Sequence, residues 1–158
     1  MTESCVLESP VGLLRVTETG GAISVLDWTD DPATPPTTPV LRDAAQQLAD
    51  YFDGKLADFD LPLAPEGTAH QKKVWAALCA IPAGAVRSYG DLAKEIGSSA
   101  RAVGTACGKN PIPIIVPCHR VLATGGGIGG YSGRGGVATK RILLNLEGAH
   151  LEGDLFSR

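Results

Sequence analysis

A thiol, an imidazole and a guanidinium stand in consecutive positions at Cys118, His119 and Arg120, directly after Pro117. A cysteine becomes a nucleophile as its thiolate, and a neighbouring base or positive charge is needed to form that thiolate near neutral pH. We expect His119 and Arg120 to supply these. The alternative that the residues leave open is an inert, buried cysteine beside a hydrogen-bonded histidine.

The direction of the chain decides whether His119 can act on Cys118. The β-branched residues 114–116 predict a short strand, and consecutive side chains of a strand point to opposite faces. His119 therefore reaches Cys118 only if the chain turns at this point or if a water bridges the two side chains. Pro117 favours such a turn.

A histidine that acts as a base also needs a third group to orient it. Glu147 is the candidate because it ends a predicted helix over 137–147, where the helix dipole disfavours a carboxylate. A carboxylate in that place gains from another partner, and we predict that this partner is His119. The same helix is expected to turn three apolar residues inward, Ala138, Ile142 and Leu146.

The elements that must position these groups fall into two predicted domains, residues 1–64 and residues 65–158. In the first domain, three β-prone runs, a proline-rich loop and an amphipathic helix follow in order, at 5–7, 13–17, 22–28, 30–39 and 41–54. This order predicts a small α/β domain in which one helix packs on an antiparallel sheet.

Signals for helix starts dominate the second domain. Thr68 and Gln71 have capping-box spacing, Ser88 precedes a short helix that Gly97 ends, and Ser98 or Ser99 starts another helix that runs to about residue 108. Its predicted inner face is Ala100, Val103, Gly104 and Cys107. Two short helices joined by a glycine-containing turn are typical of a helix-turn-helix, although any αα-hairpin gives a similar pattern.

The two domains differ in charge. Residues 1–65 carry three basic and eleven acidic side chains, whereas residues 66–158 carry eleven basic and six acidic ones. A basic second domain suits an anionic partner such as nucleic acid, and a merely solvated basic face is the alternative. Arg101 supports an anionic partner as well. A cation in the first turn of a helix interacts unfavourably with the helix dipole, so the stability of the helix does not explain an arginine at this position.

Several classes of protein are disfavoured. No apolar run approaches the ~20 residues that span a bilayer, and the N-terminus resembles no signal peptide. The four cysteines are widely spaced, which argues against a disulfide framework and a zinc site, and the glycine-rich stretch at 125–136 has no P-loop signature. We expect a cytoplasmic protein, associated with the nucleoid if its source is bacterial, that holds no metal.

The order of motifs in the second domain resembles one family, the alkylguanine-DNA alkyltransferases, also called methylated-DNA–protein-cysteine methyltransferases. The matching motifs are RSYG at 87–90, ARAVG at 100–104, NP at 110–111, IIVPCHRV at 114–121, GYSG at 130–133 and LLNLEG at 143–148. The resemblance implies a ribonuclease H-like α/β domain followed by a mostly helical, winged-helix-like domain. It also implies DNA repair by irreversible, single-turnover transfer of an alkyl group from O6-alkylguanine, extending to O4-alkylthymine, without a cofactor.

Carried over position by position, the resemblance assigns the reaction to a few residues. Cys118 is the alkyl acceptor, and His119 is the base, which acts through a bound water and is oriented by Glu147. Asn110 holds the turn of the active site. Tyr89 disturbs the phosphate of the target nucleotide and then donates a proton to the guanine.

The resemblance also implies the surfaces that meet the substrate. Duplex DNA lies against the helix-turn-helix through its minor groove, and Arg101 fills the gap left by the flipped nucleotide. The residues implied in DNA binding are Tyr89, Gly90, Arg101 and Thr124. Those implied in the guanine pocket are Cys107, Pro113, Val121, Tyr131, Ser132 and Gly133. A monomer is expected, and cooperative binding along DNA stays open.

The sequence departs from familiar members in three places. The turn at 97–100 is shorter and the loop at 134–135 is longer, which leaves the breadth of the pocket open. Cys107 stands where some relatives have methionine, as a small apolar filler or as a second thiol near the substrate. The N-terminal metal ligands of some relatives are not reproduced beside Cys5.

Two other functions are weighed against the repair protein. A lesion-binding protein without transfer activity, or a helix-turn-helix regulator, would not need Cys118, because relatives of the first kind lack that cysteine. A cysteine hydrolase would need an oxyanion hole, for which only the glycine-rich stretch offers backbone donors.

Overall fold

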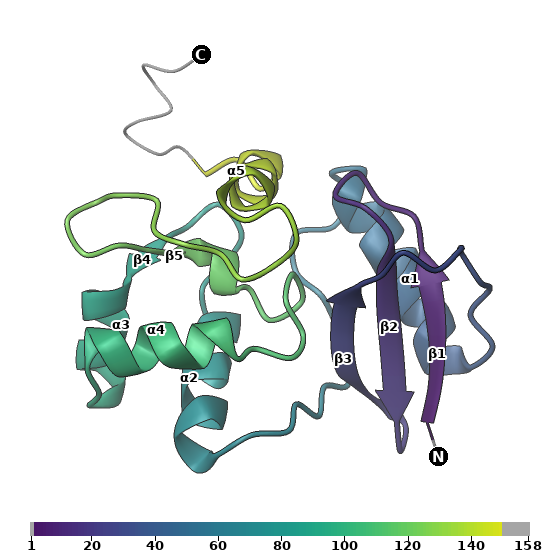
Figure 1. The fold of residues 1–158 in the computed structure, drawn as a ribbon, viewed down its shortest axis with the longest axis horizontal. Helices are drawn as coiled ribbons and strands as arrows, with labels where there is room; N and C mark the ends of the chain where they lie inside the picture. The colour runs from purple at the N-terminus through teal and green to yellow at the C-terminus, as the bar shows by residue number, and fades with distance from the viewer. Residues whose placement is uncertain (1, 150–158) are drawn as a thin grey trace. The chain divides into compact units, whose positions relative to one another are not determined.

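A computed structural model describes residues 2–149 of the chain. The chain divides into two compact units, Met1–Glu66 and Gly67–Arg158, and each unit is described by itself. Figure 1 shows the strands of the first unit and the helices of the second. No helix within residues 2–149 has the length and apolar character to cross a membrane.

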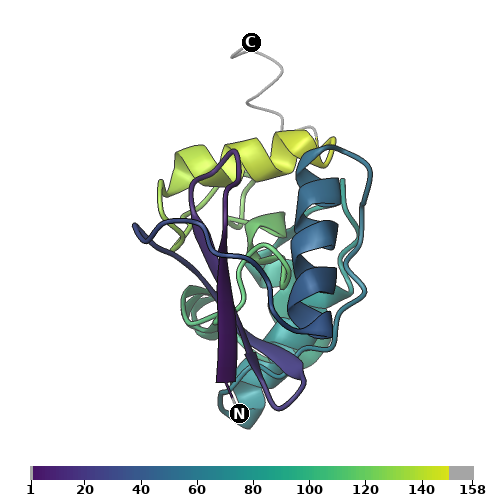
Figure 2. The ribbon, with the colours of Figure 1, turned by 90° about the vertical axis from the view of Figure 1, so that its right-hand side faces the viewer.

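The first unit is a three-stranded antiparallel sheet with one helix along a face of it (Figure 2). Strands β1 (Thr2–Leu7), β2 (Leu14–Thr19) and β3 (Ala22–Trp28) are adjacent in sequence order. Helix α1 (Pro39–Phe52) starts at Thr38, whose hydroxyl accepts a hydrogen bond from the backbone of the first turn. The buried residues of the helix are Leu41, Ala44, Leu48 and Tyr51. The predicted sheet and its helix are confirmed.

The second unit is mostly helical. Its helices are α2 (Ala69–Cys79), α3 (Tyr89–Ile96), α4 (Ala100–Gly108) and α5 (Val137–Leu146). The other elements are a short 3₁₀ helix, η1 (Cys118–Arg120), and two short parallel strands, β4 (Arg87–Ser88) and β5 (Val121–Leu122).

The helix starts of the second unit follow the predicted caps. Thr68 and Gln71 form a complete capping box at α2, and the hydroxyls of Ser88 and Ser99 cap α3 and α4. Gly97 ends α3 in the left-handed conformation, with φ of 69°, which turns the chain into α4. Helices α3 and α4 form the predicted helix-turn-helix.

Two predicted helix faces are wrong in part. On α4, Ala100 is exposed, Gly104 is only partly buried, and Ala106 is buried beside Val103 and Cys107. On α5, the predicted inward residues are exposed or partly buried, and the buried ones are Thr139, Lys140, Leu143 and Leu144. The α5 error has a physical cause, because a lysine with an apolar stem occupies a core position that apolar periodicity assigns to a hydrophobic residue.

The predicted strand at 114–116 is also wrong, because residues 111–117 form turns. The backbone N–H of Val116 donates to the carbonyl of Ile112 (2.8 Å), and Ile114 has φ of 74°, a strained value for a β-branched residue. Pro117, with φ of −83° and ψ of 66°, forms an inverse γ-turn in which Cys118 N donates to Val116 O (2.8 Å). This turn places Cys118 at the start of η1.

Candidate active site

Cys118 lines a small cavity in the second unit. Its side chain is 5% exposed, and the cavity has a volume of about 170 Å³. The lining residues come from α3, α4, η1 and the segment before α5: Tyr89, Gly104, Cys107, Gly108, Cys118, Gly130, Tyr131 and Ser132. The acceptor candidate therefore faces a partly open space between the helix-turn-helix and the glycine-rich segment.

Asn110 holds the turn that carries Cys118. Its Nδ2 atom donates to the carbonyl of Val116 (2.8 Å), and its Oδ1 atom accepts from the backbone of Ile112 (2.9 Å). The carbonyl of Val116 also accepts the backbone N–H of Cys118. One amide side chain therefore closes both ends of the turn, and this stabilises the strained residue Ile114 between them.

His119 and Glu147 form a buried pair. Nε2 of His119 lies 2.7 Å from Oε2 of Glu147, and their side chains are 0% and 1% exposed. Because a carboxylate accepts, Nε2 carries the hydrogen of the neutral ring and leaves Nδ1 as a proton acceptor. Nδ1 is buried and has no hydrogen-bond partner among the described residues. Within residues 2–149, therefore, no direct hydrogen bond joins Nδ1 of His119 to the sulfur of Cys118.

Arg120 points to Glu147 and not to Cys118, so its predicted effect on the thiol is wrong. Its Nε donates to Oε1 of Glu147 (2.8 Å) and its Nη2 to Oε2 (3.0 Å), while Nη1 donates to the carbonyl of Ile81 (2.5 Å). This forked pair fixes the position of the carboxylate inside the unit. Arg120 therefore acts on the orientation of His119 through Glu147.

The cation that does act on Cys118 is Lys140, which the sequence prediction missed. Its side chain is fully buried, and its Nζ donates to the carbonyls of Val121 (2.7 Å) and Gly130 (3.0 Å). Burial lowers the pKa of Lys140 to about 8, so the ammonium form still predominates at neutral pH. The signal in the sequence is its spacing, because Lys140 lies two helical turns before Glu147, the C-cap residue of α5, and so lies on the same side of the helix.

The pKa shifts describe a site at rest. Burial raises the pKa of Cys118, whereas a hydrogen bond from Asn110 and the charge of Lys140 lower it, so the net effect keeps a protonated thiol. Burial lowers the pKa of His119 despite its bond to Glu147, so the ring is neutral at pH 7. Burial, together with the nearby thiols, raises the pKa of Tyr89 to about 12, which keeps its phenol protonated.

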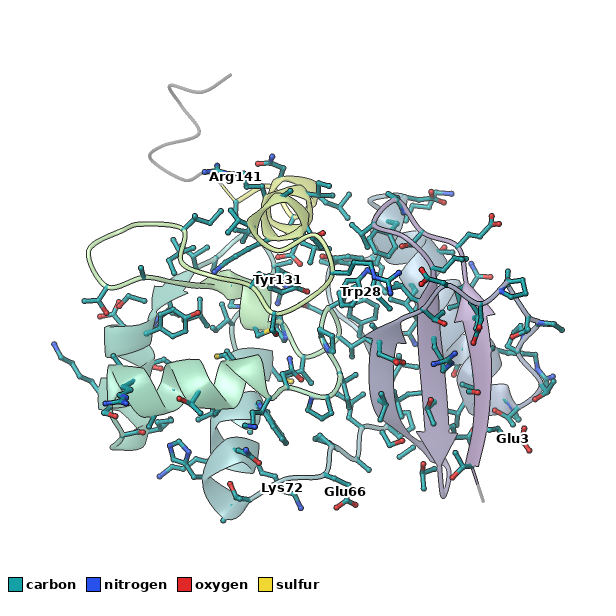
Figure 3. All side chains as sticks on the ribbon, in the orientation of Figure 1. Glu3, Trp28, Glu66, Lys72, Tyr131 and Arg141 are labelled. Carbon is teal, nitrogen blue, oxygen red and sulfur yellow. The ribbon has the colours of Figure 1, made fainter. Side chains whose placement is uncertain are left out.

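The predicted pocket residues divide into two groups. Cys107, Tyr131 and Ser132 line the cavity, and Figure 3 labels Tyr131 on the segment that precedes α5. Three others do not reach its wall: Pro113, Val121 and Gly133. The prediction missed the glycines of the wall, at 104, 108 and 130, which leave space because they have no side chain.

The predicted DNA-binding residues lie on and around the helix-turn-helix. Arg101 is exposed in the first turn of α4, and its guanidinium makes no hydrogen bond or ion pair with the described residues. Tyr89 and Gly90 begin α3, and the backbone N–H of Gly90 donates to the hydroxyl of Thr124 (3.2 Å). Tyr89 also lines the cavity, so one residue links the exposed helix pair to Cys118.

The remaining two cysteines are not among the residues that line this cavity. Cys5 is buried on β1 of the first unit, and Cys79 is exposed at the end of α2. Over residues 2–149, no three histidine, cysteine or acidic side chains are grouped as metal ligands.

Two family models match the chain. The model described as "6-O-methylguanine DNA methyltransferase, ribonuclease-like domain" matches residues 5–65. The model described as "6-O-methylguanine DNA methyltransferase, DNA binding domain" matches residues 69–149.

Known proteins are similar over nearly the whole chain. A curated protein of Mycobacterium tuberculosis, named methylated-DNA–protein-cysteine methyltransferase, is 43% identical over 157 residues, which is 94% of each chain. The crystal structure of Mycobacterium tuberculosis O6-methylguanine methyltransferase is similar with a TM-score of 0.82, at 41% identity and 99% coverage of each chain. The crystal structure of Mycobacterium tuberculosis OGT in complex with DNA has a TM-score of 0.80, at 43% identity and 95% coverage of each chain.

Proposed function

We propose, from the premise that this chain belongs to the methylated-DNA–protein-cysteine methyltransferase family, that Cys118 is the sulfur that takes the alkyl group. The chain is a DNA-binding repair methyltransferase. The observation that carries the assignment of Cys118 is the 2.7 Å bond between His119 and Glu147. That bond fixes a neutral base on the same 3₁₀ helix as the thiol.

Among the four cysteines, geometry favours Cys118. Cys5 belongs to the first unit, and Cys79 is exposed at the end of α2 and does not line the cavity beside Cys118. Cys107 lines the same cavity as Cys118, burial raises the pKa of both thiols, and the charge of Lys140 lowers both. What favours the thiolate of Cys118 in addition is the hydrogen bond from the Asn110 amide.

Proton removal from Cys118 goes through a water to His119. Nδ1 is the free acceptor of the ring, and a water between it and the sulfur connects two groups that share no direct bond. The imidazolium that forms is stabilised by Glu147, whose carboxylate Arg120 holds in place. The charge of Lys140 also stabilises the developing thiolate.

The transfer is a displacement at the alkyl carbon of the lesion. The sulfur of Cys118 forms a bond to that carbon while the bond from the carbon to O6 of guanine breaks, and its electron pair stays with the base. Tyr89 then supplies a proton to the departing guanine, which suits a phenol that stays protonated beside the cavity. The product thioether is stable in water, so each molecule reacts once.

The damaged nucleotide must leave the duplex to meet the buried sulfur, because Cys118 is 5% exposed. We propose that α4 enters the minor groove, where its small residues permit close approach. Arg101, exposed and without a partner in the described chain, then occupies the gap in the stack. We also propose that Thr124 and Gly90, which are joined by a hydrogen bond, contact a phosphate of the target strand.

The proposal also covers the substrates, the oligomeric state and the location of the protein. The substrates are O6-alkylguanine and O4-alkylthymine in duplex DNA, and the protein acts as a monomer in the cytoplasm, on the nucleoid if its source is bacterial. Cooperative binding along DNA is a separate property that a length series of duplexes measures.

The test uses a duplex with one O6-methylguanine and the full-length protein. Mass spectrometry of tryptic peptides is expected to find one added methyl group on the peptide 110–120, which contains Cys118. The variant Cys118→Ser should lose transfer and keep its affinity for DNA, and the control Cys79→Ser should transfer normally. A methyl group on another cysteine, or tight binding of the lesion with no transfer, contradicts the proposal.

A further inference from the structure

Two thiols line one cavity, and the proposed reaction uses one of them. Cys107 on α4 and Cys118 on η1 are 6% and 5% exposed, and both contribute to the wall of the cavity of about 170 Å³. A small apolar filler at position 107 would not need sulfur, because alanine and valine are also available to such a place. The second thiol therefore calls for its own chemical explanation.

The backbones of the two cysteines are held together by one residue. The carbonyl of Cys107 accepts the backbone N–H of Asn110 (3.2 Å), and the side chain of Asn110 donates to the carbonyl of Val116 (2.8 Å). That carbonyl also accepts the backbone N–H of Cys118 (2.8 Å). A continuous chain of three hydrogen bonds thus fixes where the two cysteines lie relative to each other.

Both sulfurs also lie within electrostatic range of one ammonium group. The charge of Lys140 lowers the pKa of Cys107 and of Cys118, against the larger effect of burial. In turn the two thiolates raise the pKa of Lys140. Cys107, Cys118 and Lys140 therefore form one cluster, and the cavity is the space that the two thiols share.

We propose that Cys107 is the resolving thiol of Cys118, so that oxidation of the acceptor sulfur by hydrogen peroxide ends in an internal, reducible disulfide. The inference rests on the proposed role of Cys118 as the acceptor. Each molecule has one acceptor sulfur, and irreversible oxidation of this sulfur to sulfinic acid would inactivate the molecule before it repairs a lesion. A disulfide keeps the same sulfur recoverable.

The chemistry needs only the peroxide. The Cys118 thiolate attacks one peroxide oxygen, so an S–O bond forms, the O–O bond breaks and the released hydroxide takes a proton to become water. The sulfur of Cys107 then attacks the sulfenic sulfur, so an S–S bond forms and the S–O bond breaks. The hydroxyl group leaves with the proton of the Cys107 thiol as a second water. The two thiols together lose two electrons and two protons.

The size of the cavity favours an internal partner. Hydrogen peroxide is little larger than water and fits a space of about 170 Å³. A tripeptide thiol such as glutathione is much larger, and Cys118 at 5% exposure offers it little access. A sulfenic acid on Cys118 therefore meets Cys107 first.

Trypsin makes the disulfide directly visible. Cleavage after Arg101, Lys109 and Arg120 places Cys107 on the peptide 102–109 and Cys118 on the peptide 110–120. After the full-length protein is treated with hydrogen peroxide and its remaining thiols are blocked, these peptides should be linked, and dithiothreitol should separate them. Peroxide-treated protein whose Cys118 peptide carries sulfinic acid, with Cys107 still free, overturns the proposal.

Recovery of transfer activity is the second measurement. After peroxide and then dithiothreitol, the native chain should regain most of its transfer, whereas Cys107→Ser and Cys107→Ala should regain at least about five-fold less. Each variant is compared with its own untreated rate, and circular dichroism checks its fold. Cys79→Ser is the matched control, because it removes an exposed thiol of the same unit and should recover like the native chain. Equal recovery with and without Cys107 overturns the proposal.

The two measurements separate this inference from the proposed function. If the linked peptides form but untreated protein takes no alkyl group from DNA, the disulfide stands and the assignment of Cys118 as acceptor fails. If transfer to Cys118 occurs but the peptides never link, the repair function stands and Cys107 is not a resolving thiol.

Discussion

Nε2 of His119 lies 2.7 Å from Oε2 of Glu147, and the two side chains are almost completely buried. The same carboxylate accepts two hydrogen bonds from Arg120, so its charge is compensated without any proton from the histidine. Burial then lowers the pKa of His119 and leaves the ring neutral at rest. A base that is neutral, oriented and hidden from bulk water is the arrangement that a buried thiol requires.

Replacing Glu147 with glutamine should impair both chemistry and stability. The rate of methyl transfer is expected to fall by about 10²–10⁴-fold, because His119 loses its orienting carboxylate. Unfolding in denaturant should show a loss of about 3–5 kcal/mol, because Arg120 becomes an uncompensated buried charge. The control Glu95→Gln breaks the exposed ion pair with Arg87 and should change stability by about 0–1 kcal/mol. A Glu147→Gln protein with native transfer rates would contradict the role of the pair.

The pH dependence of transfer should report two groups. The pKa of His119 is lowered from 6.5, so its neutral form persists at that pH and the acid limb should lie below 6.5. The pKa of Lys140 is about 8, so its support of the thiolate is present below pH 8 and is lost as pH rises through that value. Single-turnover rates from pH 5 to 10 check both limbs.

Replacing Lys140 with methionine isolates the alkaline limb. The rate at pH 7 should fall about ten-fold if the ammonium contributes one pKa unit to the thiolate. The change of rate near pH 8 should also disappear, since no group with that pKa remains. The variant Lys140→Arg keeps its charge to higher pH, so the alkaline limb of the pH–rate profile should shift to higher pH. A methionine variant that retains the alkaline limb would show that another group produces it.

Replacing Asn110 with alanine should loosen the turn that carries Cys118. The two hydrogen bonds to the backbone of the turn are lost, together with the one to the Cys118 thiol, which is expected to cost about 1–3 kcal/mol of stability and to lower the transfer rate. Thermal unfolding and single-turnover transfer measure these effects. Asn145→Ala is the control, because Asn145 is exposed on α5, and it should leave both nearly unchanged.

Replacing Arg101 with alanine should separate DNA binding from folding. The free energy of binding to a duplex with a lesion is expected to weaken by about 1–3 kcal/mol. The free energy of unfolding should change by no more than about 0.5 kcal/mol, because the side chain is exposed. Fluorescence anisotropy measures the affinity. Lys55→Ala removes an exposed cation from the first unit and should bind normally. A loss of the same size in Lys55→Ala would indicate a non-specific effect of charge.

Most of the fold could be predicted from signals that act over a few neighbouring residues. The capping box at Thr68, the hydroxyls of Ser88 and Ser99 and the glycine at position 97 act on their immediate neighbours, so they can be read from a short stretch of sequence. The pairing of His119 with Glu147 was predictable for a related reason. A carboxylate at the wrong end of a helix needs a partner that the chain must supply.

The errors lie where long-range packing overrides local preference. Residues 114–116 have the composition of a strand, but Asn110 and three nearby prolines hold the segment as turns. Lys140 was missed because a buried lysine is rare and depends on carbonyls of Val121 and Gly130, which only the fold brings together. The direction of Arg120 likewise depends on where α5 packs.

Helix α5 and its C-cap residue supply Lys140 and Glu147, whereas Cys118 and His119 precede the exposed glycines 125–127. A break among those glycines would leave the nucleophile and its base on one fragment and the cation and the orienting carboxylate on the other. Neither fragment alone would hold a complete site. The chain therefore offers a natural place for a split reporter, in which a permanent alkyl label on Cys118 records that two fused partners brought the halves together.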